Sequence, residues 1–282
     1  MNAIEMKNVN KAYTNFTLQN INLSLPVGCI MGLVGENGAG KSTTIKLIMN
    51  AVKNDGGEIE VFGQKNTLPS FTQAKQDIGI VLDEAYYPEI LNAKQVNSIM
   101  KNTYKRWQEQ CYFNYIKRFS LPLDKPLKDY SRGMKMKLAI SVALSHESKL
   151  LILDEATSGL DPIVRDEMLD IFNEFTRDEN HSILISSHIT SDLEKICDYI
   201  AFIHEGKLVF CKEKDRLHEE YGIIRTTKEE MQAINSEQII GFKDNGYFVE
   251  ILVKRGQVPS QFSVENASIE EIMLFFVKGV NK

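Results

Sequence analysis

The sequence predicts an α/β protein with a largely parallel sheet, and three observations carry this prediction. A glycine-rich segment, Gly35-Glu36-Asn37-Gly38-Ala39-Gly40-Lys41-Ser42-Thr43, lies between the apolar run Cys29–Val34 and a helical pattern. A second apolar run, Leu150–Leu153, ends in two adjacent acids. A third short apolar run begins at residue 183. Short apolar runs that alternate with helical patterns are typical of buried parallel strands.

The glycine-rich segment has the spacing of a phosphate-binding loop. Its glycines allow tight turns in which successive backbone N–H groups point into one concavity. Lys41 is expected to reach the β- and γ-phosphates of a nucleoside triphosphate, and Ser42 to place its hydroxyl on Mg²⁺. The helix expected over Thr43–Asn50 adds its positive dipole end. The alternative, a glycine-rich surface turn, leaves the preceding strand and the following helix unexplained. The predicted nucleotide-binding residues of this loop are Gly35, Asn37, Gly38, Ala39, Gly40, Lys41, Ser42 and Thr43.

An antiparallel layer is expected before this loop. Alternating apolar residues begin at Ile4 and continue over Phe16–Leu25, which predicts two paired strands. Tyr13 lies in the turn between these strands. Its ring could stack on a purine base or form only the rim of the sheet, and the residues alone leave both interpretations open.

The segment after the loop is expected to begin with strands and continue with helices. Short strands are predicted over Gly57–Gly63 and Ile78–Leu82, and Asp83 follows the second. Helical periodicity extends from Asn92 to about Phe119, and a helical subdomain is expected over about residues 84–149. Its aromatic residues are interpreted as core instead of a ligand platform, because a small helical layer needs large side chains to bury enough area.

Asp154 and Glu155 end a buried strand at the edge where α/β sheets bind ligands. Because a buried charge is costly unless it is paired or bound to a metal, these acids indicate Mg²⁺ chemistry. His188 follows another buried strand at the same edge. A lone histidine is usually structural, but its position opposite a phosphate loop favours a role in the site.

Two polar residues are predicted to cap helices. Ser131 is expected to cap a helix that reaches about Ser145, and Asp161, followed by Pro162, to cap the next one. A hairpin over Tyr199–Phe210 is expected to close the main domain, which is therefore placed at residues 1–211.

A small C-terminal α+β appendage is expected over residues 212–282, where the composition becomes more polar. Its clearest elements are the strand pattern Tyr247–Val253 and a capping box at Ser268–Glu271 that introduces a final helix. The apolar side of that helix is expected to pack on its own strands instead of meeting a partner.

The composition excludes several functional classes. A net charge of -5 and a pI near 5.7 argue against nucleic acid as a partner. The 4 cysteines are far apart, which favours reduced thiols and a cytosolic protein over zinc or disulfides. No uncharged apolar run approaches the length of a membrane span, so a separate partner would have to supply any spans.

These motifs, in this order and at these separations, resemble the ATP-binding subunits of ATP-binding cassette (ABC) transporters over about residues 1–211. The resemblance implies a P-loop NTPase core with a RecA-like mixed sheet. It also implies a role for each matching residue: Ser131 and Gly133 as the signature motif, Asp154 as the magnesium residue, Glu155 as the catalytic glutamate, Asp161 as the D-loop aspartate, His188 as the switch histidine and Tyr13 as the adenine-stacking aromatic.

The chain departs from the family pattern at two places. Asp83 stands where the family usually has a glutamine, and the usual Leu-Ser-Gly-Gly-Gln is here Tyr130-Ser131-Arg132-Gly133-Met134. A carboxylate at position 83 could still meet Mg²⁺, and the alternative is a solvated loop acid. The two departures are similar to Gram-positive exporters of antimicrobial or cytolytic peptides, including the bacteriocin and phenol-soluble modulin types.

The resemblance further implies cofactors, partners and location. ATP and Mg²⁺ would be held between two copies, or between this chain and a close paralogue. The dimer would power a separate integral membrane subunit from the cytoplasmic face of the membrane. The rival interpretation is an ABC-type ATPase switch that acts on the ribosome or on DNA. Such relatives generally carry two cassettes, long coiled coils or metal-binding cysteines, none of which this sequence has.

Overall fold

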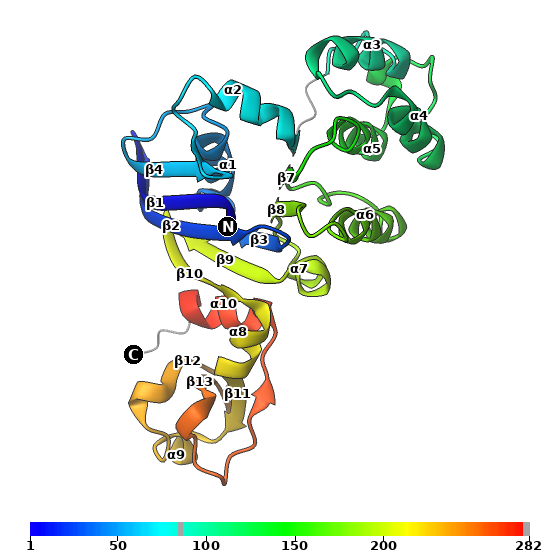
Figure 1. The fold of residues 1–282 in the computed structure, drawn as a ribbon. Coiled ribbons are helices and arrows are strands. Elements are labelled where there is room, and N and C mark those ends of the chain that lie inside the picture. Colours follow the sequence, from blue (N-terminus) through cyan, green and yellow to red (C-terminus); the bar gives the residue numbers. More distant parts are fainter. Residues whose placement is uncertain (84–86, 279–282) are drawn as a thin grey trace. The chain divides into compact units, whose positions relative to one another are not determined.

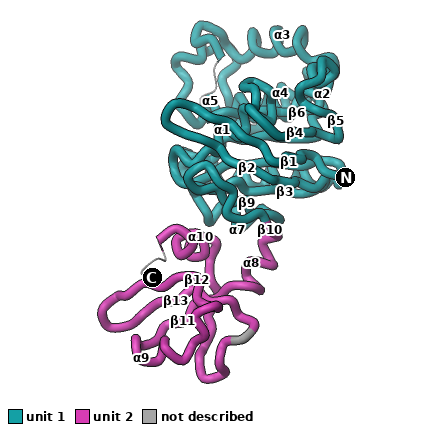
Figure 2. The backbone as a smooth tube through the Cα atoms, turned by 90° about the vertical axis from the view of Figure 1, so that its left-hand side faces the viewer, with its two compact units in different colours: residues 1–211 teal, residues 212–282 magenta. Residues whose placement is uncertain are grey.

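The computed structural model describes residues 1–83 and 87–278, and it divides the chain into two compact units. The first unit is Met1–Cys211 and the second is Lys212–Lys282 (Figures 1 and 2). Each unit has its own sheet and its own set of helices.

The strands of the large sheet are β1 (Asn2–Tyr13), β2 (Phe16–Pro26), β3 (Ile30–Val34), β4 (Gly56–Val61), β5 (Gln64–Lys65), β6 (Ile78–Val81), β7 (Leu150–Asp154), β8 (Ser182–Ser186), β9 (Tyr199–His204) and β10 (Lys207–Glu213). The helices of the first unit are α1 (Lys41–Ile48), α2 (Phe71–Ala74), η1 (Lys75–Asp77), α3 (Ala93–Thr103), α4 (Glu109–Arg118), η2 (Leu127–Asp129), α5 (Arg132–Ala143), α6 (Pro162–Phe175) and α7 (Thr190–Ile196).

The large sheet is mixed, as the sequence predicts, and its strand order is β5-β4-β1-β2-β10-β9-β3-β8-β7-β6. Strands β1, β2, β4 and β5 pair antiparallel, and β10 joins this layer to the parallel strands through Lys207 opposite Gln19. The predicted two-stranded layer is therefore four strands wide and part of the same sheet. Strands β3, β8 and β7 run parallel and in register, so their carboxyl ends meet at one edge.

The strand patterns explain this arrangement. Every residue of β3, β7 and β8 is buried, which fits strands covered on both faces. In β2 the buried residues Ile21, Leu23 and Leu25 alternate with exposed ones, which fits a layer with one face in water. The core beneath this layer includes side chains from α1, among them Ile45 and Ile48.

The predicted helical subdomain contains α3, α4 and α5, which Figure 1 shows grouped together. The helical stretch predicted from Asn92 to Phe119 is two helices, because the chain leaves the helix after Thr103 and re-enters it at Glu109. Asn92 caps α3 through a reciprocal capping box. Tyr112 is fully buried and donates its hydroxyl to Ala93 O at 2.9 Å, in agreement with a core role for the aromatics.

The second unit is a four-stranded antiparallel sheet of order β12-β13-β11-β14 with short helices. Its elements are α8 (Lys214–Glu220), β11 (Tyr221–Thr226), α9 (Lys228–Met231), η3 (Ser236–Gln238), β12 (Ile239–Asp244), β13 (Val249–Lys254), η4 (Arg255–Gln257), β14 (Glu265–Asn266) and α10 (Ile269–Lys278).

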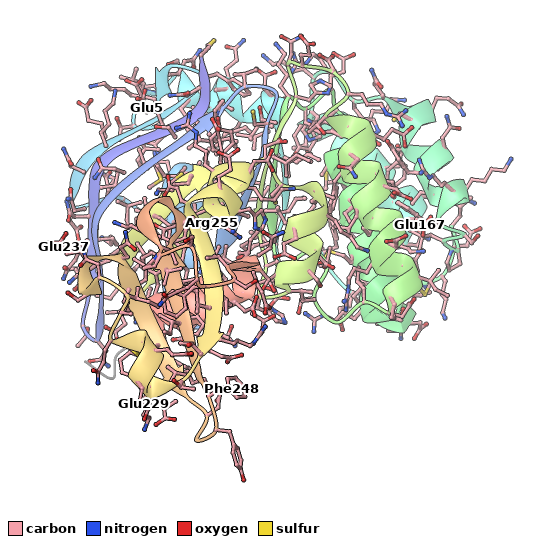
Figure 3. All side chains as sticks on the ribbon, turned by 90° about the horizontal axis from the view of Figure 1, so that it is seen from below. Glu5, Glu167, Glu229, Glu237, Phe248 and Arg255 are labelled. Carbon is pink, nitrogen blue, oxygen red and sulfur yellow. The ribbon has the colours of Figure 1, made fainter. Side chains whose placement is uncertain are left out.

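Backbone and side-chain hydrogen bonds fix the second unit. Arg255, labelled in Figure 3, donates to Tyr221 O and Glu265 O, both at 2.9 Å, and so ties two strands together. The predicted capping box is present before α10: Ser268 N donates to Glu271 Oε2 at 2.8 Å, and Glu271 N donates to Ser268 Oγ at 3.2 Å. The apolar residues of α10 include the buried Ile272, as expected for a helix that packs on its own unit.

Candidate nucleotide-binding site

The carboxyl edge of the parallel strands opens into a cavity of about 530 Å³. It lies in the first unit, at the edge where the phosphate loop follows β3 and the two acids follow β7. The described residues that line it are Asn15, Phe16, Glu36, Asn37, Gly38, Gly40, Lys41, Ser42, Thr43, Asp83 and Glu155. The structure therefore brings most of the predicted loop together with Glu155 and Asp83.

Gly40 of the phosphate loop lies close to two side chains of the antiparallel layer. Gly40 has φ of 118°, and a Cβ there would lie 2.6 Å from Leu18 Cδ1 and 2.9 Å from Phe16 Cζ. A side chain at this position would require Leu18 and Phe16 to move and would strain the backbone at this positive φ, so the position favours glycine. The helix begins at Lys41, two residues before the predicted start, because Thr44 N already donates to Gly40 O at 2.9 Å.

A turn from the neighbouring hairpin holds the backbone of this loop. Gly206, between β9 and β10, donates its N–H to Ala39 O at 3.1 Å. Gly206 O in turn accepts from Gln19 N of β2 at 2.7 Å. The Gly206 turn therefore links the phosphate loop to β2 through backbone groups alone.

Lys41 is 6% exposed and points back over the loop. Its Nζ donates to Gly35 O at 2.8 Å and to Glu36 O at 3.3 Å, and it lies 3.5 Å from Glu155 Oε1. These contacts hold an ammonium group in a cavity that is lined by residues of a glycine-rich loop and the first residues of a helix. Such an arrangement favours a polyanionic ligand.

Asp154 and Glu155 are fixed by the next strand. Ser186 Oγ, at the end of β8, donates to Asp154 Oδ1 at 2.6 Å and accepts from Glu155 N at 3.0 Å. Glu155 has φ of 52°, in the left-handed region, so the chain turns sharply after the strand and presents this side chain to the cavity. Glutamate in this conformation is uncommon and typical of functional sites.

His188 lies beside Glu155, with 2.7 Å between His188 Nδ1 and Glu155 Oε2. An ionised carboxylate only accepts hydrogen bonds, so Nδ1 carries the hydrogen in this pair. The Glu155 side chain is 14% exposed and lies between the Lys41 ammonium and the His188 ring. Glu155 therefore contacts both of the other residues predicted to be catalytic, Lys41 and His188.

The residues predicted to hold Mg²⁺ offer hard oxygen ligands. Asp154 is buried, with 6% exposure, and Ser42 and Asp83 line the cavity. Across residues 1–83 and 87–278 no group of three or more His, Cys, Asp or Glu side chains is arranged to hold a metal alone. Mg²⁺ is usually held by one or two carboxylates together with the phosphates of its nucleotide, and Asp154 and Asp83 are the carboxylates that could serve here.

Tyr13 lines a second hollow of about 590 Å³. Asn15, Phe16 and Gly38 line both hollows, so the second continues from the first. The Tyr13 side chain is half-exposed, and Lys11 Nζ lies 5.7 Å from the centroid of its ring. A planar group joined to phosphates in the first cavity would meet this ring.

Asp83 forms an ion pair with Arg132, with Nη2 2.6 Å from Oδ1. The departures from the family pattern at positions 83 and 132 are therefore in direct contact. Glu84, the next acid in the chain, lies with residues 85 and 86 outside the described residues, at the start of the predicted helical subdomain.

Ser131, Gly133 and Asp161 lie outside the set of described residues that line the cavity. Ser131 caps α5 by accepting from Met134 N at 3.2 Å. Asp161 caps α6 by accepting from Ile163 N at 3.2 Å, as its position before Pro162 predicts. Both helix starts thus form, but this copy does not bring them to its own phosphate loop.

Sequence reasoning missed several residues of the site. Phe16 packs on Gly40 and lines both hollows, yet the sequence marks it only as the first residue of a strand. Ser186 ends the apolar run that begins at residue 183, and the sequence does not mark it as the partner of Asp154. The signal that could have identified Ser186 is its position: it is a polar residue at the end of an apolar strand, and a second apolar strand ends in an acid.

The ABC transporter family is matched over residues 18–158, which is half of the chain. The chain is 36% identical to the lantibiotic transport ATP-binding protein SrtF of Streptococcus pyogenes over 75% of this chain and 91% of that protein. It is 35% identical to the bacitracin transport ATP-binding protein BcrA of Bacillus licheniformis over 68% of this chain and 63% of that protein.

Solved structures of ATP-binding cassettes also match this chain. An ATP-binding subunit of an ABC transporter matches with a TM-score of 0.70 and 26% identity over 77% of this chain and 92% of its own. A dimeric post-hydrolysis state of an ATP-binding cassette bound to ADP and Pi has the same fold, with a TM-score of 0.68, 21% identity and coverage of 74% and 98%. The chain belongs to the ABC transporter family as an ATP-binding subunit, an ATPase, and the predicted resemblance and P-loop NTPase fold are confirmed.

Proposed function

We propose that two copies of this chain, or one copy and a close paralogue, close around ATP and use its hydrolysis to drive a membrane subunit that exports amphipathic or antimicrobial peptides. The observation that carries this proposal is the contact of Lys41, Glu155 and His188 at the edge of the phosphate-loop cavity. The names of the peptide-transport relatives supply the class of cargo.

ATP would occupy the two connected hollows. Its phosphates would replace the contacts that Lys41 now makes with Gly35 O and Glu155. Its base would lie against Tyr13, which is exposed enough to stack on it. Asn37, Gly38 and residues 40–43 line the same cavity at the start of α1, and backbone N–H groups at a helix start favour the phosphate charge.

Mg²⁺, when bound with ATP, would neutralise phosphate charge in the transition state. Ser42 and Asp154 would hold it, with Asp83, which lines the same cavity as Ser42, as a third oxygen donor. Ser186 would orient the Asp154 carboxylate, because it already donates to one of its oxygens.

Glu155 would orient or deprotonate the attacking water once Lys41 turns to the phosphates. The His188 Nδ1–H donates to Glu155 Oε2, so the ring fixes the direction of the other carboxylate oxygen. His188 is half-exposed and can also reach a phosphate from the open side of the cavity.

The second copy would complete the site. Ser131 and Gly133 begin α5, whose backbone N–H groups favour an anion, but no phosphate loop of the same copy faces them. Two copies arranged head to tail would place these groups, and Asp161 at the start of α6, on the ATP of the partner. ATP would then hold the dimer closed, and hydrolysis would release it.

The proposed partner is a separate integral membrane subunit. Across the described ranges the structure contains no helix that is long and apolar enough to cross a bilayer. We place the chain at the cytoplasmic face of the membrane, docked through the α3–α5 layer. The rival function, a switch acting on the ribosome or DNA, has less support because SrtF and BcrA are transport proteins by name.

Isolation of the tagged full-length chain from gently solubilised membranes tests the partner. An integral membrane protein is expected to co-isolate with it and to raise its ATP turnover. Cells that lack the chain are expected to become more sensitive to amphipathic peptides, and the Lys41→Ala chain should fail to restore them. Recovery of ribosomes or DNA in place of a membrane protein would favour the rival function.

We further propose that the first unit is the ATPase domain and the second an accessory domain for regulation or dimer contact. Ending the chain after Glu213, the last residue of β10, should leave a folded protein that binds ATP, because the whole large sheet and every lining residue of the cavity lie before that point. Thermal unfolding and ATP titration would check this. An insoluble product, or one without ATP affinity, would place the second unit in the core fold.

A further inference from the structure

The loop after β6 is fastened to the first turn of α5 by two ion pairs. Arg132 pairs with Asp83 at 2.6 Å, and Lys135 pairs with Glu89 at 3.2 Å. The two pairs have the same polarity, with cations on the helix and acids on the loop. They differ in one respect, because Asp83 lines the phosphate-loop cavity and Glu89 lies outside the set of described residues that line it.

Arg132 also lies against the segment that precedes α6. A Cβ at Gly159 would be 3.1 Å from Arg132 Nη1 and 3.2 Å from its Cζ, and Gly159 has φ of 70°. Glycine at this position leaves room for the guanidinium beside the backbone. Arg132 therefore contacts two segments at once, the end of β6 and the turn before Leu160.

The Asp83 carboxylate faces two cation positions. It accepts a hydrogen bond from Arg132, and Asp83 also lines the cavity where the cation of the nucleotide would lie. Arg132 itself is the first residue of α5, directly after the cap Ser131, at the helix start that favours an anion. A guanidinium there can bind phosphate oxygens through two parallel hydrogen bonds.

We propose that Arg132 is a positioning residue with two alternative partners. It pairs with the Asp83 carboxylate in the free chain, and it binds the phosphates of the ATP held by the second copy in the dimer. This inference rests on the proposed dimer. In the free chain Arg132 competes with the divalent cation for Asp83. When the partner's ATP approaches the start of α5, Arg132 turns to it and releases Asp83 to the cation of its own site. Each site thereby raises the affinity of the other, as linkage requires.

The alternative is an ordinary surface ion pair, since the side chains of Arg132 and Asp83 are 55% and 49% exposed. Such pairs shift an equilibrium by only about 1.5- to 5-fold. A surface pair without a coupling role would leave cation binding unchanged when Arg132 is removed. The two interpretations therefore differ in the Mg²⁺ dependence of nucleotide binding, which needs no measurement of activity.

The test uses full-length protein with Glu155→Gln, so that ATP is not consumed. Binding of a fluorescent ATP analogue is followed during a Mg²⁺ titration, at a protein concentration below that of dimer formation. Arg132→Ala should lower the Mg²⁺ midpoint by about 1.5- to 5-fold, because Asp83 is released. The same variant should need more ATP to form a dimer in sedimentation, because it loses a cation that faces phosphate. Overall damage to the fold would impair both measurements.

Three control variants test whether the effect of Arg132→Ala depends on its ion pair with Asp83. In the Asp83→Asn background, Arg132→Ala should no longer move the Mg²⁺ midpoint. Lys135→Ala, which removes the neighbouring cation of the same helical turn, should leave both measurements unchanged. Arg132→Lys should return the Mg²⁺ midpoint most of the way to that of the parent, since lysine keeps the positive charge.

An Arg132→Ala effect of equal size with and without Asp83, or an equal shift in Lys135→Ala, would overturn the inference. Failure of the proposed function is a different result, in which the Glu155→Gln parent itself binds no nucleotide or stays monomeric at saturating Mg²⁺ and ATP. That result overturns both.

Discussion

Glu155→Gln is expected to lower ATP turnover by about 10²- to 10⁴-fold, the range that one general base contributes. ATP binding should survive, because glutamine has nearly the same size and keeps an oxygen that can accept from His188. The variant should also accumulate as an ATP-bound dimer, since the step that opens the dimer is blocked. Turnover by phosphate release and dimer content by sedimentation are the measurements.

Glu167→Gln is the matched control for this variant. Glu167 lies on α6, pairs with Lys137 at 3.1 Å and is labelled in Figure 3. It makes the same chemical change outside the cavity and should leave turnover within about 2-fold of the parent, as expected for a surface substitution. Wild-type turnover in Glu155→Gln would remove Glu155 from the catalytic role.

Lys41→Ala should weaken ATP binding by roughly 10- to 100-fold, because it removes charge-assisted hydrogen bonds to phosphate that are each worth about 1.5–3 kcal/mol. Calorimetric titration with ATP measures this loss. The fold should be checked by thermal unfolding, since Lys41 is buried and bonded to the carbonyl of Gly35.

Lys46→Ala supplies the comparison for Lys41. Lys46 lies on the same helix α1 but is exposed to solvent, so its removal tests the effect of losing one positive charge near the site. Its ATP affinity should stay close to that of the parent. Undiminished binding by Lys41→Ala would argue against the phosphate-loop assignment.

The sequence predicts strands and helix caps well where the residues within one segment are enough to determine the structure. The strands β3, β7 and β8 are short apolar runs, and their burial on both faces follows directly from that composition. The caps of α5 and α6 follow from Ser131 and from Asp161 with Pro162, because these residues satisfy N–H groups that every helix start leaves open.

The sequence predicts less where contacts join distant segments. Nothing near Asp83 in the chain indicates that Arg132, far along the sequence, is its partner. Ser186 likewise meets Asp154 only because β7 and β8 are neighbours in register. Strand order decides such pairs, and periodicity within one segment carries no information about the order.

Gly206 illustrates how the phosphate loop tolerates change. The contacts of this residue with Ala39 and Gln19 use only backbone N–H and C=O groups. Substitutions at the residues beside Gly206 therefore leave these hydrogen bonds in place, whereas an insertion or deletion between β9 and β10 would shift both at once. Gly206 itself accepts no side chain, because its φ is 75° and a Cβ there would lie 2.0 Å from Thr17 O. At this joint the site is specified by one glycine and by the length of the loop, and changes of amino-acid identity are tolerated only at the neighbouring positions.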